Sequence, residues 1–442
     1  MRFGTDGLRG VAGAELTPEL ALALGRAAAR VLGATTWFVG RDPRRSGPML
    51  TAAFAAGLAA EGAEVADLGV LSTPGVAYWA QAERAPAAVV SASHNPFDDN
   101  GIKLFAAGGR KLVDEVERRL EAELAAVPAP PLRSGADVGT VAPVEGAADR
   151  YADHVVATLD GRDLAGLRVV LDAANGAGVT TAPGVLRRLG CDVVSVLGAE
   201  PDGLNINDGC GSTHLEPLAA AVVARGADAG IALDGDADRC LAVDHRGHVV
   251  DGDQMMALLA LDLRDRGGLD HDTLVATVMS NLGLRLAMAE AGVRLETTAV
   301  GDRYVLDRME EGGYALGGEQ SGHVILRRLA TTGDGLLTAV HLLDVVRRSG
   351  RPLAALAGVV HRLPQVLVNV RVAGAARKAL AAPEEVKAAV AEVEAQLGDH
   401  GRVLLRPSGT EPLVRVMVEA PTDAEASAVA ARLADVVRSA LG

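Results

Sequence analysis

The sequence predicts an α/β protein with three similar βαβ-based domains of mixed sheets and a smaller C-terminal α+β domain. Two observations predict this class. Three stretches repeat one plan of buried strand, polar turn, helix closed by glycine, and second strand, whereas the segment after residue 362 follows a different order. At 442 residues, the chain is also too long for a single hydrophobic core.

The three repeats share one pattern of hydrophobicity. The predicted strand, helix and second strand are 37–39, 49–60 and 62–65 in the first repeat, 167–171, 181–189 and 190–194 in the second, and 274–278, 282–290 and 292–296 in the third. Nearly continuous apolar strands are typical of a sheet covered on both faces, and glycine commonly ends a helix. The pattern therefore predicts three βαβ units.

A later apolar run in each repeat leads into a loop of polar side chains. These runs are 87–90 before Ser91, 229–233 before Asp234, and 314–316 before Gly317. Because α/β sheets bind ligands beyond the carboxyl ends of their strands, similar units should place these loops at similar sheet edges. The three loops are therefore expected to face a common central cleft.

The remaining segments complete the predicted organisation. The alanine-rich stretch 18–33 is interrupted by charges and predicts an amphipathic helix, and the Pro/Gly-rich stretch 127–146 predicts a linker. The last segment predicts strands at 366–372 and 402–405 and helices at 383–397 and 422–440. The predicted domains are residues 1–145, 146–245, 246–362 and 363–442.

Composition excludes several classes of protein. A net charge of −14 argues against a broad surface for nucleic acid or anionic membrane, so an anionic substrate would need local clusters of cations. Cys191, Cys210 and Cys240 lack CxxC spacing, which disfavours a disulfide framework or a zinc site. No apolar segment resembles a signal or a membrane span. We expect a soluble cytoplasmic protein, and a homodimer is compatible with the sequence.

Ser93 lies in the string Ser91-Ala-Ser-His-Asn-Pro96, directly after an apolar run. Adjacent side chains diverge, so Ser93 and His94 do not constitute a catalytic triad, and the string alone is also typical of an Asn-Pro turn. Lys103 follows in a glycine-flanked segment and supplies a cation for a phosphoserine dianion, or a proton-transfer group. Our hypothesis is that Ser93 carries a phosphoryl group.

Asp234, Asp236 and Asp238 alternate along a loop, so a looped backbone can direct all three carboxylates at one ion. Ligands that are all oxygen suit Mg²⁺. A calcium EF-hand is excluded because its sixth and twelfth positions would be Arg239 and His245. A solvated acidic turn is the alternative, although an arginine directly after the triad suits a site beside a phosphate.

Two further loops are candidate recognition sites. Glu319, Ser321 and His323 lie in a glycine-bounded loop, where glutamate can accept hydrogen bonds from a sugar and histidine can transfer protons. Arg406 and Arg415 flank a second loop of hydroxyls and glycine that suits a phosphate but is not a Walker motif. A plain structural turn is the alternative for either loop.

Taken together and in this order, the four loops resemble those of the α-D-phosphohexomutase superfamily. The resemblance spans nearly the whole chain, from Phe3–Gly10 to the Arg406 loop. Within the superfamily, the chain is similar to the branch that acts on glucosamine phosphates in the segments Cys210–His214 and Gly318–Ser321. It carries Gly409 where phosphomannomutases usually carry asparagine.

The resemblance implies roles for particular residues. Ser93 would be the phosphoserine, and its phosphate would bind one Mg²⁺ together with Asp234, Asp236 and Asp238. Glu319 and Ser321 would contact the sugar. The residues implied for the reacting centre are Arg9, His94, Lys103, Arg239 and His323, with Lys103 and His323 as proton-transfer candidates; those implied for the non-reacting phosphate are Arg406, Ser408, Gly409, Thr410 and Arg415.

The implied activity is an isomerisation of glucosamine 6-phosphate to glucosamine 1-phosphate through glucosamine 1,6-bisphosphate. The product would feed UDP-N-acetylglucosamine and cell-wall synthesis. A phosphomannomutase/phosphoglucomutase with the same chemistry is the first alternative. A non-catalytic sugar-phosphate-binding protein and a simple Mg²⁺ phosphatase are alternatives from other classes.

Overall fold

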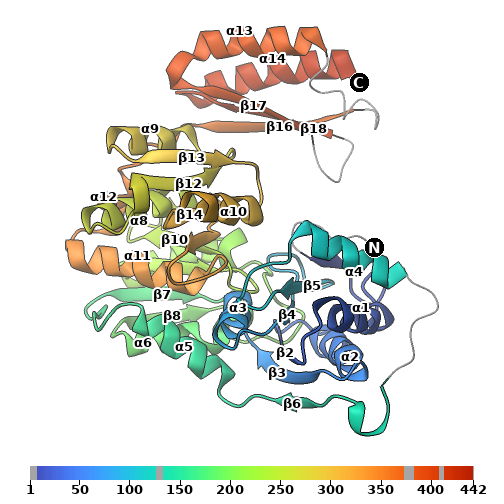
Figure 1. The fold of residues 1–442 in the computed structure, drawn as a ribbon. Coiled ribbons are helices and arrows are strands. Elements are labelled where there is room, and N and C mark those ends of the chain that lie inside the picture. The colour runs from blue at the N-terminus through green and yellow to red at the C-terminus, as the bar shows by residue number, and fades with distance from the viewer. Residues whose placement is uncertain (1–6, 126–132, 373–382, 408–412, 442) are drawn as a thin grey trace. The chain divides into compact units, whose positions relative to one another are not determined.

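The structure, a computed structural model, describes residues 7–125, 133–372, 383–407 and 413–441. It separates into two compact units, and each is described by itself. The first comprises Met1–Met279 with Gly292–Val359, and the second comprises Ser280–Ala291 with Val360–Gly442. Figure 1 shows the strands and helices of both. Among the described residues, no helix is long and apolar enough to cross a membrane.

The first unit contains three mixed sheets. In hydrogen-bonded order, the first sheet is β1 (Leu8–Val11), β5 (Asp99–Phe105), β4 (Ala87–Val90), β2 (Thr36–Arg41), β3 (Glu64–Val70) and β6 (Val141–Pro143). The second is β11 (Val249–Val250), β10 (Cys240–Asp244), β9 (Ala229–Leu233), β7 (Arg168–Asp172) and β8 (Asp192–Leu197). The third is β13 (Arg294–Thr298), β12 (Thr273–Thr277), β14 (Leu316–Gly318) and β15 (Val324–Leu326).

One strand order recurs in all three sheets, as β5-β4-β2-β3, β10-β9-β7-β8 and β15-β14-β12-β13. The last three strands of each set are parallel, and the first is antiparallel to its neighbour. The predicted repeat is therefore confirmed. Each of the three polar loops joins a buried parallel strand to its antiparallel partner, so the loops occupy equivalent positions.

Helices flank these sheets, and their ends follow ordinary capping rules. Helix α1 begins after Thr17, whose hydroxyl accepts a hydrogen bond from the Leu20 N–H, and ends at Gly33 in the left-handed conformation. The helices of the first unit are α1 (Pro18–Leu32), α2 (Gly47–Ala60), α3 (Thr73–Ala82), α4 (Asp114–Ala125), α5 (Ala147–Ala157), α6 (Ala182–Arg188), α7 (Glu216–Arg225), α8 (Gly252–Asp265), α10 (Asp302–Gly312), α11 (Gly335–Ser349) and α12 (Leu353–Ala357).

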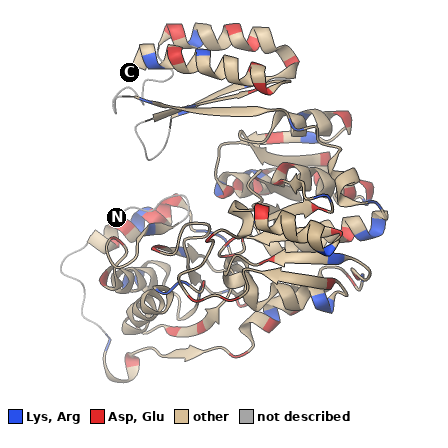
Figure 2. Cartoon of the chain, turned by 180° about the vertical axis from the view of Figure 1, so that it is seen from behind, with Lys and Arg blue, Asp and Glu red and all other residues tan. Residues whose placement is uncertain are grey.

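The second unit is a three-stranded antiparallel sheet with helices. Its elements are β16 (Gln365–Arg371), β18 (Leu413–Glu419), β17 (Arg402–Pro407), α9 (Leu282–Glu290), α13 (Glu384–Leu397) and α14 (Asp423–Leu441). Helices α13 and α14 lie side by side on one face of the sheet (Figure 1), and Figure 2 shows charges of both signs interspersed along them. Valines of β18 and the apolar face of α14 form the core between them.

The predicted class is confirmed, with three differences in detail. The antiparallel strand after each polar loop, such as β5, was not predicted, nor was β18 in the second unit. The linker prediction is wrong for Val141–Pro143, which form β6 beside β3. All three residues of β6 are exposed, so only backbone pairing defines this edge strand and no hydrophobic pattern reveals it.

Two glycines allow the backbones of α1 and α2 to touch. A Cβ added at Gly25 would lie 2.1 Å from the Phe54 carbonyl oxygen, and one at Gly57 would lie 2.2 Å from the Leu22 carbonyl oxygen. Backbone atoms cannot move aside as a flexible side chain can. The close crossing of α1 and α2 therefore depends on glycine at both positions.

We predict that Gly57→Ala lowers the free energy of unfolding by about 1–3 kcal/mol, because the new methyl group overpacks the α1–α2 interface. Urea unfolding followed by circular dichroism measures this. Gly184→Ala on α6 is the matched control, since no atom lies within 4 Å of a Cβ there. Better helix propensity should make that variant neutral or more stable by up to about 1 kcal/mol. If the two variants were equally stable, the close contact of α1 with α2 would not depend on glycine at position 57.

Candidate active site

Ser93 lies in the loop between β4 and β5 with a left-handed backbone, φ +54°. Its side chain is buried, and its Oγ donates a hydrogen bond of 2.6 Å to Asp234 Oδ2. Its N–H donates to Ser91 Oγ at 2.9 Å. Non-glycine residues rarely adopt this conformation, and those that do cluster at functional sites. The strained serine thus meets a carboxylate that comes from a different sheet.

Glycine lets the loops of the first and second sheets come together. The loop between β9 and β10 contains Asp234 to Arg239, and a Cβ at Gly235 would lie 2.6 Å from the Ser93 carbonyl oxygen. Within the first sheet, a Cβ at Gly101 would lie 2.6 Å from the Ser91 carbonyl oxygen. Both contacts are with backbone, so neither position accepts a side chain without displacement of the Ser93 loop.

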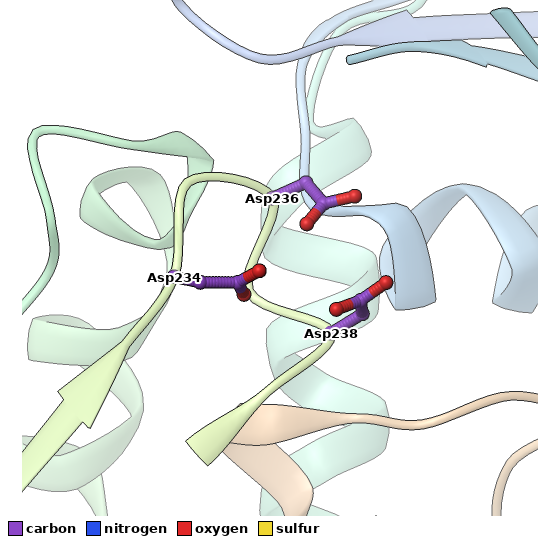
Figure 3. Close-up of side chains that lie close together, drawn as sticks. All are labelled: Asp234, Asp236 and Asp238. Atoms are coloured by element: carbon purple, nitrogen blue, oxygen red, sulfur yellow. The ribbon is translucent and has the colours of Figure 1, made fainter. Parts of the chain in front are cut away.

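The side chains of Asp234, Asp236 and Asp238 are buried and turn toward one another (Figure 3). Each offers one oxygen, and these oxygens all lie within 4.8 Å of one another. Burial, and then the charges of Asp238 and Asp236, raise the pKa of Asp234 well above its usual range. The cluster therefore needs positive charge beside it to stay ionised.

Donors on β5, on α3 and in the loop itself stabilise the ionised carboxylates. Lys103, a buried residue of β5, places Nζ 2.8 Å from Asp236 Oδ2 and 3.2 Å from Asp238 Oδ2. Thr73, the first residue of α3, donates its hydroxyl to Asp236 Oδ2 at 2.6 Å. The Arg239 N–H donates to Asp234 Oδ1 at 3.2 Å.

The donor set of this cluster fits a magnesium ion. All of its ligand atoms are carboxylate oxygens, which Mg²⁺ prefers. Asp238 Oδ1 is buried and accepts no hydrogen bond from any residue that the structure describes. A buried carboxylate oxygen without a donor is costly, and a cation removes that cost.

Arg239, His94 and Arg9 lie close to the same centre. Burial opposes the charge of Arg239, but Asp234, Asp238, Glu319 and Asp236 outweigh burial and raise its pKa. For His94, burial and then Arg239 and Arg9 lower the pKa to about 4. His94 Nδ1 lies 3.4 Å from Ser93 Oγ, so a neutral imidazole faces the serine at neutral pH.

The third loop joins β14 to β15 and carries the predicted sugar-binding residues. Glu319 Oε1 accepts the Gly301 N–H at 3.1 Å, and the Ser321 hydroxyl donates to Glu319 Oε2 at 3.3 Å. His323 is buried, with Nε2 3.5 Å from Asp302 Oδ2, and Lys111 pairs with that same oxygen. The Cys240 N–H donates to the Gly322 carbonyl at 3.0 Å, which joins this loop to the β9–β10 loop of the three aspartates.

The fourth predicted loop belongs to the second unit. Arg406 on β17 is paired in register with Arg415 on β18, so the two arginines occupy facing positions of the antiparallel sheet. Ser408, Gly409 and Thr410 lie outside the residues that the structure describes.

Several residues of the site were missed in the sequence. Arg44 and Asp42 lie just after β2 and contact the Ser93 loop, and Thr73 and Asp302 lie at the first turns of α3 and α10. Asp42 and Arg44 follow the buried strand β2, which is parallel to β4, so they lie at the same sheet edge as the Ser93 loop. That position was the signal that could have identified them.

Comparisons with known proteins agree with this architecture. Four family models match the chain in order: Phosphoglucomutase/phosphomannomutase alpha/beta/alpha domain I at residues 1–129, domain II at 149–247, domain III at 251–363, and the C-terminal domain at 367–436. These matches cover most of the sequence.

Relatives and a solved structure extend the likeness over the whole chain. The chain is 59% identical to a phosphoglucosamine mutase of Saccharopolyspora erythraea, covering 98% of each protein, and 55% identical to one of Symbiobacterium thermophilum, covering 99% of each. The crystal structure of a phosphoglucomutase/phosphomannomutase family protein from Burkholderia thailandensis matches with a TM-score of 0.80 at 27% identity, covering 99% of this chain and 97% of the other. The chain therefore belongs to the phosphoglucomutase/phosphomannomutase family.

Proposed function

We propose that this protein interconverts glucosamine 6-phosphate and glucosamine 1-phosphate by phosphoryl transfer through Ser93. One observation carries the proposal: a buried serine hydroxyl donates to a cluster of three buried aspartates beside a buried lysine. A phosphoryl group on Ser93 Oγ would meet both the carboxylate cluster, which fits a cation, and the Lys103 ammonium. The named relatives favour the glucosamine substrate over other hexose phosphates.

The reaction consists of two transfers of opposite direction. In the first, the sugar 1-hydroxyl oxygen bonds to phosphorus as the bond between phosphorus and Ser93 Oγ breaks. The sugar hydroxyl proton passes to a base, and Ser93 Oγ takes up a proton. The 1,6-bisphosphate then reorients in the site, so that its 6-phosphate faces Ser93. In the second, Ser93 Oγ gives up its proton to a base and bonds to the phosphorus of the 6-phosphate. The bond between that phosphorus and the sugar 6-oxygen breaks, and the 6-oxygen takes up a proton.

The residues of the first unit suit these steps. Lys103 and His323 are the proton-transfer candidates, whereas His94 stays neutral near pH 7 and serves as a hydrogen-bonding partner of Ser93 Oγ. Asp234, Asp236 and Asp238, with the Ser93 phosphate, would hold Mg²⁺. When bound, this ion neutralises charge on the transferring phosphoryl group. Arg9 and Arg239 add positive charge near the reacting oxygens.

Recognition of the substrate is divided among the remaining loops. We propose that Glu319 and Ser321 contact the sugar, a role supported by their hydrogen bond to one another and by the Gly301 N–H that orients Glu319. The residues proposed for the non-reacting phosphate are Arg406, Ser408, Gly409, Thr410 and Arg415. The domain limits given above also stay predictions. The same holds for a cytoplasmic location and for a homodimer without nucleic-acid or membrane partners.

The first prediction for this function concerns the nucleophile. Ser93→Ala should abolish mutase activity and remove the phosphoserine, because alanine offers no oxygen for the phosphoryl group. Mass spectrometry of the intact protein and of its peptides measures the phosphate, and a coupled assay measures turnover. Ser91→Thr, which keeps a hydroxyl in the same loop, is the control and should stay phosphorylated at Ser93. Normal turnover by Ser93→Ala would disprove the assignment.

The second prediction concerns the metal. Removal of divalent cations with EDTA should lower kcat at least about 100-fold, and Mg²⁺ should restore it, since a preorganised charge on the transferring group is lost and regained. Asp238→Asn should raise the Mg²⁺ concentration for half-maximal activity by about 10–100-fold. Full activity in EDTA, or an unchanged Mg²⁺ response in this variant, would exclude the metal role.

The third prediction concerns the sugar. Measured kcat/KM should be higher for glucosamine 6-phosphate than for glucose 6-phosphate or mannose 6-phosphate, because Glu319 can pair with the substrate amine. Glu319→Gln should lower kcat/KM more for glucosamine 6-phosphate than for glucose 6-phosphate. A wild-type preference for mannose or glucose 6-phosphate would instead assign the protein to the sister activity.

A further inference from the structure

Arg44 is a buried arginine beside the Ser93 loop for which the proposed chemistry has no role. It follows β2 in the turn that leads to α2, and its side chain is fully buried. Its Nε donates to Asp42 Oδ2 at 2.9 Å, so its charge is balanced by a buried carboxylate rather than by substrate. The rest of its guanidinium is directed at backbone.

The guanidinium of Arg44 donates to four carbonyl oxygens, three in the Ser93 loop and one at the first residue of β5. Nη2 donates to the carbonyls of Ser93 and Asn95, both at 2.8 Å. Nη1 donates to the carbonyl of Asp99 at 3.0 Å and also to that of Pro96. A planar fork of five N–H donors suits this arrangement, which a lysine ammonium with three donors cannot reproduce.

Asp42, the carboxylate paired with Arg44, fixes the N–H group of Ser93 through Ser91. Asp42 Oδ2 accepts the Ser91 hydroxyl at 2.6 Å, and Ser91 Oγ in turn accepts the Ser93 N–H at 2.9 Å. The Asp42–Arg44 pair therefore controls both the N–H and the carbonyl of Ser93, one through Ser91 and the other directly. The segments that build the first, second and third sheets are called the first, second and third modules. Asn207, which follows β8 in the second module, adds a donor to the Ser93 carbonyl at 2.9 Å.

These bonds define the backbone conformation that aims the nucleophile. Ser93 has φ +54°, a conformation that serine rarely adopts, and in it Oγ donates a hydrogen bond to Asp234. A rotated Ser93 carbonyl would lose its bonds to Arg44 and Asn207. Small misplacements of a reacting atom reduce rates steeply.

We propose that Arg44 is a positioning residue for phosphoryl transfer, which holds the Ser93 loop by its carbonyls so that Oγ faces the carboxylate cluster. This inference rests on the proposed function. Arg44 contacts neither Ser93 Oγ nor the cluster of Asp234, Asp236 and Asp238; its hydrogen bonds go to Asp42 and to backbone carbonyls, so it acts through the loop backbone. Its loss should affect the chemical step rather than the binding of the sugar phosphate.

The test compares Arg44→Met and Arg44→Lys with wild type, measuring kcat and KM for glucosamine 6-phosphate in the full-length phosphorylated protein. We expect kcat to fall at least about 100-fold in Arg44→Met with KM changed less than about 3-fold, and Arg44→Lys to recover part of kcat. Ser91→Ala, a milder change that cuts only the link from Asp42 to the Ser93 N–H, should lower kcat about 10-fold.

A stability control separates positioning from simple destabilisation. Leu58→Ala removes a buried side chain of α2 from the core of the same module and changes no residue of the Ser93 loop. Its kcat should stay within about 3-fold of wild type below the unfolding transition. The proposal is overturned if folded Arg44→Met or Ser91→Ala keeps wild-type kcat, or if Leu58→Ala loses as much. Wild-type protein without turnover, tested beside Ser93→Ala, would refute the proposed function itself and the inference with it.

Discussion

The mutual repulsion of Asp234, Asp236 and Asp238 is the constraint on which the rest of the first unit depends. Their oxygens lie within 4.8 Å of one another in a buried loop, and such carboxylates become protonated unless positive charge or hydrogen bonds oppose the repulsion. The lysine of β5 and the hydroxyl at the start of α3 come from the first module. The cluster is therefore completed only when the first two modules pack together.

The same packing determines the conformation of Ser93. Its carbonyl accepts hydrogen bonds from Arg44 within its own module and from Asn207 in the second, while Gly235 leaves room for that contact. The third module is joined through Asp302, which pairs with Lys111 and lies beside His323. Three loops of equivalent topology thus bring together the Ser93 hydroxyl, the three aspartates and the loop of Glu319 and His323 by contacts between modules.

Much of this arrangement could be predicted because it follows from local pattern. The buried strands β4, β9 and β14 are short apolar runs, and each is followed at once by the loop that carries Ser93, Asp234 or Glu319. Periodicity locates such elements, and a repeated topology predicts that their loops occupy equivalent sheet edges. The alternation of the three aspartates was sufficient to indicate a cation site, and the structure brings the three side chains together.

The sequence by itself determined the modules, their repeated order and the chemical type of each loop, because hydrophobic periodicity and residue chemistry are local properties. Only the tertiary structure decided which charges meet. Arg44 is one arginine among many in the sequence, and its role comes from four carbonyls brought to it by the pairing of β4 with β2 and β5. The depressed pKa of His94 likewise arises from burial and from two arginines distant in sequence, Arg239 and Arg9. Interactions of this kind depend on distance in space, which no spacing along the chain specifies.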